Sequence, residues 1–134
     1  MASAQDVVTT FIQTLERKDI DAAVMLLSSD VSYDNMPMQP IVGRAAVRVA
    51  LGSFLNAATR VEWVVSRTVA ADNAVVNERV DRFEINGKWL ELPVAGVFEV
   101  NGDGLITLWR DYFDLGSYTQ QMADVMGQGS AADG

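Results

Sequence analysis

The sequence predicts an α+β fold, in which a curved mixed or antiparallel sheet forms a cone packed against three N-terminal helices. Apolar residues recur at helical spacing in the first part of the chain and at every second position in four later segments. Short turns join the later segments, and Asn86-Gly87 is a strong two-residue hairpin signal. Helices followed by hairpin-connected strands are typical of the α+β class.

Three helices are expected before the strands, over residues 4–17, 18–30 and 45–58. Ser3 is placed to cap the first helix, and Asp19 lies near the start of the second. The segment VSYDNMP then leads into a loop that Pro37 and Pro40 fix. These helices can cover one face of the sheet and close the cone.

The four strand-like segments span residues 61–70, 74–85, 88–100 and 105–115. Their alternating pattern and the turns between them predict an antiparallel meander. The chain has no internal repeat and no composition change that would mark a domain boundary. Residues 1–126 are therefore predicted to form a single domain, and the small polar segment 127–134 is predicted to be a flexible tail.

The composition narrows the possible functions. The 134 residues include no cysteine and no histidine, so catalysis would depend on carboxylates, Arg, Lys, Tyr, hydroxyls or amides. A net charge of −8 disfavours nucleic acid and anionic membranes as partners. No apolar run approaches a membrane span and no signal peptide is evident, which predicts a cytoplasmic protein. No cofactor and no metal site are expected.

Charged residues occur where the strands should face the core. Arg79 and Asp81 lie two apart in the second strand-like segment, so they share one face with Phe83. Asp111 lies between Trp109 and Phe113 in the same way. A structural ion pair is one interpretation. An active site is the other, since two carboxylates that share one guanidinium should also share a proton, which raises the pKa of one of them.

Tyr33 and Asn35 form a further polar pair, in the segment SYDNMPMQP. In an extended segment their side chains would point the same way, and a phenol and an amide can together hold one water molecule. An Asx-type turn before Pro37 is the simpler interpretation of the same residues.

Taken together, these motifs resemble the limonene-1,2-epoxide hydrolase family, whose cone-shaped α+β fold is shared with ketosteroid isomerases and nuclear transport factor two. The resemblance rests on YDNMP, ERVD, GVFEV and ITLWRDYFDL in this order, and on FIQTL in the first helix. Together these stretches extend over nearly all of the chain except the tail. Each motif alone is weak, but their combination is specific.

The resemblance implies a role for each polar residue. Asp111 would be the general base that takes a proton from water, and Tyr33 and Asn35 would hold that water. Asp81 would be the general acid that protonates the epoxide oxygen. Arg79 would bind and orient both aspartates. The product would be a vicinal diol, formed in one step without a covalent intermediate.

The resemblance also implies a small apolar epoxide, cyclic or terpene-like, and water as the reactants, and a homodimer as the assembly. The substrate pocket is expected to be apolar, with lining residues drawn from Ile12, Leu15, Phe54, Leu55, Phe83, Leu92, Val94 and Phe113. Each of these residues could instead be part of the core.

Two other functions fit the same fold. One is a different enzyme, either a proton shuttle like ketosteroid isomerase or a polyketide cyclase. The other is a binding or dimerisation module without catalysis, in which the buried charges are a structural ion-pair network.

Overall fold

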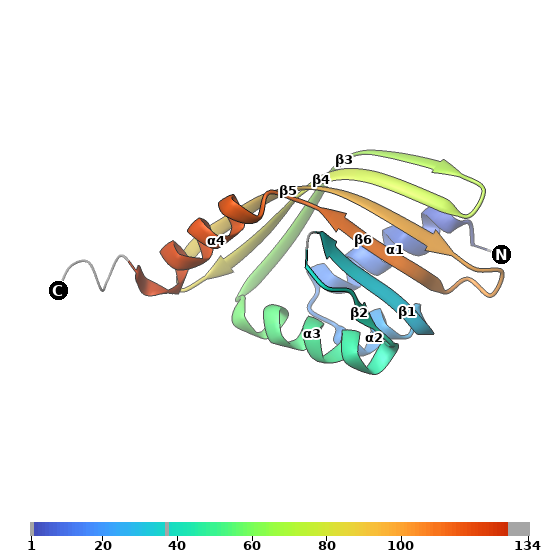
Figure 1. Ribbon diagram of the computed structural model, residues 1–134, viewed down its shortest axis with the longest axis horizontal. Coiled ribbons are helices and arrows are strands. Elements are labelled where there is room, and N and C mark those ends of the chain that lie inside the picture. Colours follow the sequence, from blue (N-terminus) through green and yellow to red (C-terminus); the bar gives the residue numbers. More distant parts are fainter. Residues whose placement is uncertain (1, 37, 129–134) are drawn as a thin grey trace.

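The computed structural model describes residues 2–36 and 38–128. One six-stranded sheet dominates the described chain, with helices packed on its inner face and a further helix after the last strand (Figure 1). The elements are α1 (Ala4–Glu16), α2 (Ile20–Val24), β1 (Leu27–Met36), β2 (Ile41–Val42), α3 (Arg44–Ala57), β3 (Arg60–Ala71), β4 (Ala74–Ile85), β5 (Lys88–Val100), β6 (Ile106–Tyr112), α4 (Leu115–Ala123) and the π-helical turn η1 (Asp124–Gln128).

The strands lie in the order β2-β1-β6-β5-β4-β3. Strands β1 and β6 are parallel, and all other neighbours are antiparallel. Figure 1 shows the sheet curving around the side on which α1, α2 and α3 gather. The predicted α+β class, with a curved mixed sheet and three N-terminal helices, is confirmed.

Helix α1 begins and packs as the sequence predicts. The side chain of Ser3 accepts a hydrogen bond from the Asp6 backbone, and the Asp6 side chain bonds back to Ser3. The apolar side of α1 is fully buried against the sheet, where the ring of Phe11 meets the ring of Trp109 edge-on at 5.0 Å. This contact fixes α1 over the middle of the inner face.

The second predicted helix is much shorter than expected. It ends at Val24, and the chain from Leu27 onward is strand β1 rather than helix and loop. Val31 and Tyr33 are both buried in β1, at the period of two that a strand requires. Parallel pairing with β6, far away in the sequence, overrides the local helical preference of this segment.

Two features of the second half were not predicted. Helix α4 follows β6, with the side chain of Asp114 capping its N-terminus. Ile106 and Trp109 are both buried although they lie three residues apart on β6, because a register shift between β5 and β6 reverses the alternation there. Of the predicted tail, residues 127 and 128 belong to η1, and 129–134 lie outside the described residues.

The hairpin between β4 and β5 confirms the predicted turn. Asn86 and Gly87 have φ values of 54° and 76°, so both lie in the left-handed region that a two-residue type I′ turn requires. This turn sets the register in which Asp81 faces Leu92 and Arg79 faces Val94. No helix within the described residues is long and apolar enough to cross a membrane.

Candidate active site

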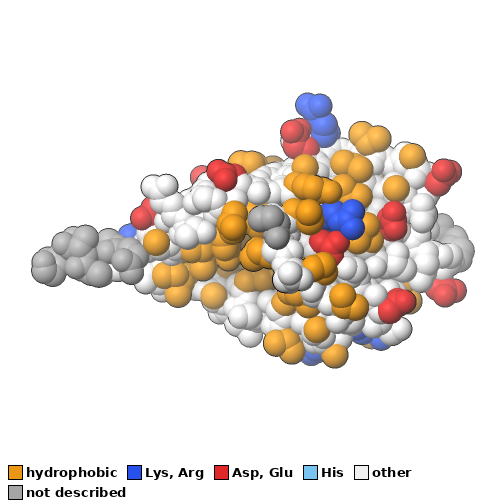
Figure 2. All heavy atoms as spheres, viewed as in Figure 1, with side chains coloured by type: hydrophobic (Ala, Val, Ile, Leu, Met, Phe, Trp, Pro, Cys, Tyr) orange, Lys and Arg blue, Asp and Glu red, His pale blue; other side chains and the backbone are white. Residues whose placement is uncertain are grey.

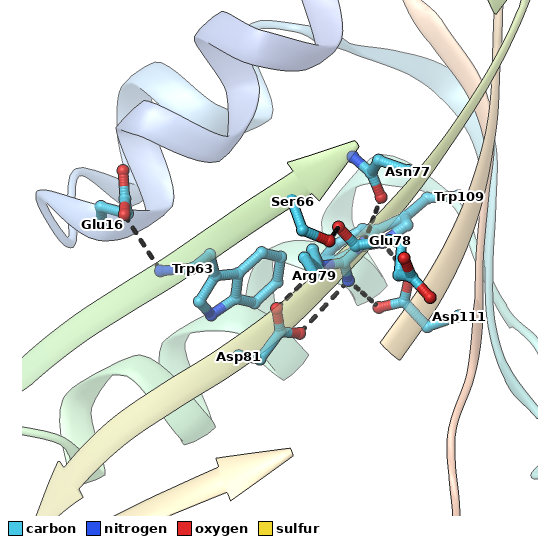
Figure 3. A network of polar contacts seen from close by, with 9 residues as sticks. All are labelled: Glu16, Trp63, Ser66, Asn77, Glu78, Arg79, Asp81, Trp109 and Asp111. Carbon is cyan, nitrogen blue, oxygen red and sulfur yellow. Dashed lines mark hydrogen bonds and ion pairs between the residues drawn. The ribbon is translucent and has the colours of Figure 1, made fainter. Parts of the chain in front are cut away.

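A buried arginine joins two buried aspartates on the inner face of the sheet (Figure 3). Arg79 on β4 is 1% exposed and donates to both oxygens of Asp81, through Nε at 2.7 Å and Nη2 at 3.2 Å. The same Nη2 donates to Oδ2 of Asp111 on β6, at 2.7 Å. The three side chains that the sequence singled out therefore form one contiguous cluster.

Strand β5 separates β4 from β6, and Gly96 on β5 makes the cluster possible. In the sheet register Gly96 lies between Asn77 on β4 and Asp111 on β6. A Cβ atom on Gly96 would overlap Nη1 of Arg79 and would lie 3.0 Å from both Asn77 Oδ1 and Asp111 Oδ1. The glycine thus leaves the space through which the guanidinium reaches across the sheet.

Three residues that sequence reasoning did not single out complete the cluster. Asn77 accepts a hydrogen bond from Nη1 of Arg79 at 2.9 Å, and Trp109 donates its indole N–H to Oδ1 of Asp111 at 3.1 Å. The guanidinium of Arg79 lies over the Trp63 ring, 4.6 Å from its centroid. Asn77 and Trp109 each lie two residues from a predicted charge, so strand alternation could have identified them.

The charges of the cluster do not balance when both carboxyls are ionised, because one positive and two negative charges leave a net charge of −1. Burial raises the pKa of Asp81 to about 7, with Arg79 opposing the change and Asp111 adding to it. Burial also raises the pKa of Asp111, with Arg79 and Trp109 opposing the change. Burial lowers the pKa of Arg79, but the charges of Asp111 and Asp81 outweigh it, so the guanidinium stays charged.

One proton shared by the two carboxyls makes the cluster neutral. Asp111 accepts from two different donors, Arg79 and Trp109, whereas both of the bonds to Asp81 come from Arg79. Each carboxyl thus accepts two hydrogen bonds, and only the bond from the Trp109 indole comes from an uncharged donor. With its pKa raised to about 7, Asp81 is a carboxyl that can hold this proton near neutral pH.

Tyr33 and Asn35 lie on β1, beside the carboxylate of β6. The register of the parallel pair places Tyr33 next to Trp109 and Asn35 next to Asp111, and the Tyr33 ring stacks on the Trp109 ring at 3.8 Å. Burial and the negative charge of Asp111 raise the pKa of Tyr33, with Asn35 opposing, so the phenol keeps its proton. Strand β1, which the sequence did not predict as such, is what brings this pair to Asp111.

The carboxyls open onto a largely apolar cavity of about 340 Å³, a volume suited to a small organic ligand. Figure 2 shows hydrophobic side chains gathered in the hollow between α4 and α3. The cavity is lined by Tyr33, Asn35, Met38, Ser53, Phe54, Ala57, Trp63, Asp81, Phe83, Ile85, Leu90, Leu92, Val94, Asp111, Phe113, Tyr118, Met122 and Met126.

Five of the eight predicted pocket residues line this cavity, namely Phe54, Phe83, Leu92, Val94 and Phe113. Leu15 and Leu55 do not, because both are fully buried in the hydrophobic core. Ile12 also lies outside this lining and faces a smaller cavity between α1 and β3. The lining from α4 and η1, which includes Tyr118 and Met122, was not predicted because α4 itself was not.

No cluster of three or more acidic side chains in the described ranges is arranged to hold a metal ion. The polar groups that the cavity offers are instead two buried carboxyls with raised pKa values, a phenol and an amide. Two buried carboxyls that share one proton are typical of an acid–base enzyme.

Comparison with known proteins identifies the kind of enzyme. Residues 2–124 match the limonene-1,2-epoxide hydrolase catalytic domain. The chain therefore belongs to the limonene-1,2-epoxide hydrolase family and is an epoxide hydrolase, with an epoxide and water as its reactants.

Individual relatives agree with this family. Epoxide hydrolase EphG of Mycobacterium tuberculosis is 35% identical over 108 residues, which are 81% of this chain and 71% of EphG. The solved structure of an LEH-like epoxide hydrolase of M. tuberculosis is 30% identical, with a TM-score of 0.80 and 96% of each chain covered. The epoxide hydrolase/cyclase-like enzyme SalBIII is 17% identical, with a TM-score of 0.78 over 85% of this chain and 92% of its own, and shows the shared fold alone.

Replacement of Gly96 by alanine should disrupt the cluster, because the new methyl group would occupy the space of the Arg79 guanidinium. Forcing a side chain into a packed site typically costs about 1–3 kcal/mol, and displaced buried charges add to this. Gly102→Ala is the matched control, since nothing lies within 4 Å of its Cβ position. Urea unfolding of both variants measures the difference, and equal stabilities would contradict the role assigned to Gly96.

Proposed function

We propose that this epoxide hydrolase adds water to a small apolar epoxide, cyclic or terpene-like, in one step and without a covalent intermediate. The product is a vicinal diol. The observation that carries the proposal is the placement of two carboxyls on one buried arginine, at the edge of an apolar cavity. An acid and a base in one cavity serve the two proton transfers that epoxide opening needs.

Asp81 acts as the general acid. An epoxide oxygen is a poor leaving group until it is protonated, and a carboxyl with a pKa of about 7 is still protonated in a large fraction of molecules near neutral pH. As the carbon–oxygen bond breaks, its electron pair stays on the oxygen, which takes the proton of Asp81. Arg79 stabilises the carboxylate that results, because it already donates two hydrogen bonds to it.

Asp111 acts as the general base, and Tyr33 and Asn35 hold the attacking water. The water oxygen bonds to an epoxide carbon while Asp111 takes one of its protons. Holding the water in line converts a bimolecular encounter into a positioned attack. After turnover Asp111 carries a proton and Asp81 has lost one, so the cycle closes when one proton returns to Asp81.

The apolar walls set the substrate class. Phe54 and Phe83 meet edge-on at 5.7 Å, and Leu92, Val94 and Phe113 continue the wall around the carboxyls. Contact with these side chains stabilises a bound hydrocarbon ring, because apolar surface leaves water. The bound ring also displaces water from the cavity, which strengthens the electrostatic interactions of the charged cluster. No cofactor is needed, since water is the only other reactant.

A homodimer formed through the outer face of the sheet is part of this proposal. Four apolar side chains on that face are partly or largely exposed, and these are Val64, Val69, Val76 and Tyr112. Sedimentation should give twice the chain mass of 14.6 kDa. A species of 14.6 kDa at micromolar concentration would contradict the dimer. It would not contradict the proposed reaction, which does not depend on the assembly.

The reaction is tested by following cyclohexene oxide and limonene oxide in water enriched in heavy oxygen. The native chain should form diol that carries one labelled oxygen. Asp111→Asn should be slower by about 10²–10⁴-fold, the usual contribution of a general base. Asp103→Asn, which makes the same change in an exposed turn between β5 and β6, should be unaffected.

A single turnover with excess enzyme separates the one-step route from a covalent one. Label should enter the diol, and none should enter the carboxyls of Asp81 or Asp111. Label in an aspartate would show a covalent intermediate and overturn the one-step mechanism. Full activity of Asp111→Asn would overturn the assignment of the base.

A further inference from the structure

The substrate cavity continues along the sheet well beyond the two carboxyls. Its lining on β4 runs from Asp81 through Phe83 to Ile85, and its lining on β5 runs beside it from Val94 to Leu90. Every second residue of a strand points to the same face, so these side chains form one floor. The step from Asp81 to Ile85 spans about 13 Å of extended strand, at about 3.3 Å per residue.

In the opposite direction the cavity ends at Asp111. The next pair of inner-face residues in the register is Trp109 on β6 and Phe98 on β5, and both side chains are fully buried. Phe11 of α1 packs edge-on against both rings, with centroids 5.0 Å from Trp109 and 6.5 Å from Phe98. The core fills the space behind Asp111, so the reacting groups lie at one end of the cavity and not in its middle.

Two contacts hold α4 and η1 alongside the far part of the floor. The side-chain amide of Gln121 accepts from the backbone N–H of Glu91 at 2.8 Å and donates to the carbonyl of Glu91 at 2.9 Å. The side chain of Asn86, in the hairpin turn, donates to the backbone carbonyl of Val125 at 2.8 Å. Residues 122–126 therefore lie beside the part of β5 between residue 91 and the turn.

The walls of this far part are apolar and partly open. Met122 and Met126 line the cavity from the side of α4 and η1, and Met126 is 55% exposed. Ala57 lines it from the end of α3, which lies near the same end of β4 because the Thr59 backbone donates to the carbonyl of Glu84 at 2.8 Å. Hydrophobic side chains that gather in one hollow, as in Figure 2, are typical of a site for an apolar ligand.

We propose that the substrate binds end-on, with its epoxide ring at the carboxyls and an apolar chain that extends along β4, β5 and α4. This inference rests on the proposed function and specifies the shape of its substrate. An extended chain advances about 1.2 Å per bond, so about 13 Å of floor accommodates a chain of about ten carbons. The preferred substrates are then epoxides with the ring at one end of such a chain. A cyclic or terpene-like epoxide with an apolar side chain has the same shape.

The dependence of the rate on chain length tests the far part of the cavity. Each methylene group that enters the cavity leaves water and strengthens binding. From 1,2-epoxybutane to 1,2-epoxydodecane, kcat/KM should rise about twofold to fourfold for each added CH₂. The rise should stop at about ten carbons, where the end of the chain passes Met126 and reaches solvent. A kcat/KM value that is independent of chain length would overturn the proposal.

A pair of isomers tests the end-on orientation without turnover. Calorimetry on the slow Asp111→Asn variant compares 1,2-epoxydecane with cis-5,6-epoxydecane, which contains the same atoms. The 1,2-isomer should bind about 10-fold more tightly, because the core behind Asp111 fills the space that the second chain of the 5,6-isomer would need. Equal or tighter binding of the 5,6-isomer would overturn the proposal.

A substitution at the far end of the cavity locates the chain. Ala57→Leu places a larger apolar side chain there, so the ratio of kcat/KM for 1,2-epoxydecane to kcat/KM for 1,2-epoxybutane should fall about 10-fold. Ala46→Leu makes the same change at an exposed position of α3 and should keep the native ratio. A general loss of folded enzyme cancels in each ratio. An unchanged ratio in Ala57→Leu would contradict the proposed position of the chain.

The same measurements distinguish the end-on chain from the proposed function. If the native chain hydrolyses cyclohexene oxide but shows no dependence on chain length, the proposed function stands and the end-on chain is removed from it. If the native chain hydrolyses no epoxide, the proposed function fails, and the end-on substrate fails with it.

Discussion

A single buried positive charge shared by two carboxyls is the constraint on which the site depends. Arg79 lies in the sheet with almost no exposure and donates to Asp81 and to Asp111. A buried ion pair is expensive unless its charges are matched, and here they match only when one carboxyl keeps a proton. In the proposed mechanism, this need for electrical neutrality inside the fold supplies an acid and a base at the same place.

The rest of the fold holds this cluster in position. The cluster draws on β4 and β6, and Gly96 on the strand between them leaves room for the guanidinium. The parallel strand β1 adds Tyr33 and Asn35 on the far side of Asp111. Helices α1 and α3 close the inner face, and α4 completes the wall of the cavity beyond β6. Strands β1, β4, β5 and β6 therefore all contribute residues to the site, and the register between the strands sets the spacing of these residues.

Strong local patterns in the sequence predicted much of the fold and of the charged cluster. Alternation placed Arg79, Asp81 and Asp111 on the inner face, and the Asn86-Gly87 turn fixed the hairpin that aligns β4 with β5. Strand β1 was missed because its pairing partner β6 lies far away in the sequence, and local signals carry no information about that pairing. The sequence also could not show which carboxyl holds the shared proton, since this depends on the burial and the hydrogen-bond partners of each carboxyl in the fold.

The distinction between core and cavity wall was the hardest to predict. Phe54 and Leu55 are neighbours on α3, yet Phe54 lines the cavity and Leu55 is buried in the core. Both locations select large apolar side chains, so composition cannot separate them. Gly96 and Trp63 were overlooked for a related reason, because a glycine that leaves room for a side chain and a ring that lies under a guanidinium are visible only against their neighbours in space.

The location of the shared proton is the most direct test. Aspartate labelled with carbon-13 at the carboxyl would be titrated by NMR, with Asp81→Asn used to assign the Asp81 signal. Because burial raises the pKa of Asp81 to about 7, its carboxyl should be protonated at pH 6 and lose its proton as the pH rises through about 7. Asp111 is the ionised partner in the proposed pair, and its carboxylate accepts from Arg79 and Trp109. An Asp81 carboxyl that is ionised across the whole range from about pH 5 to about pH 8 would contradict the shared proton and the acid–base pair built on it.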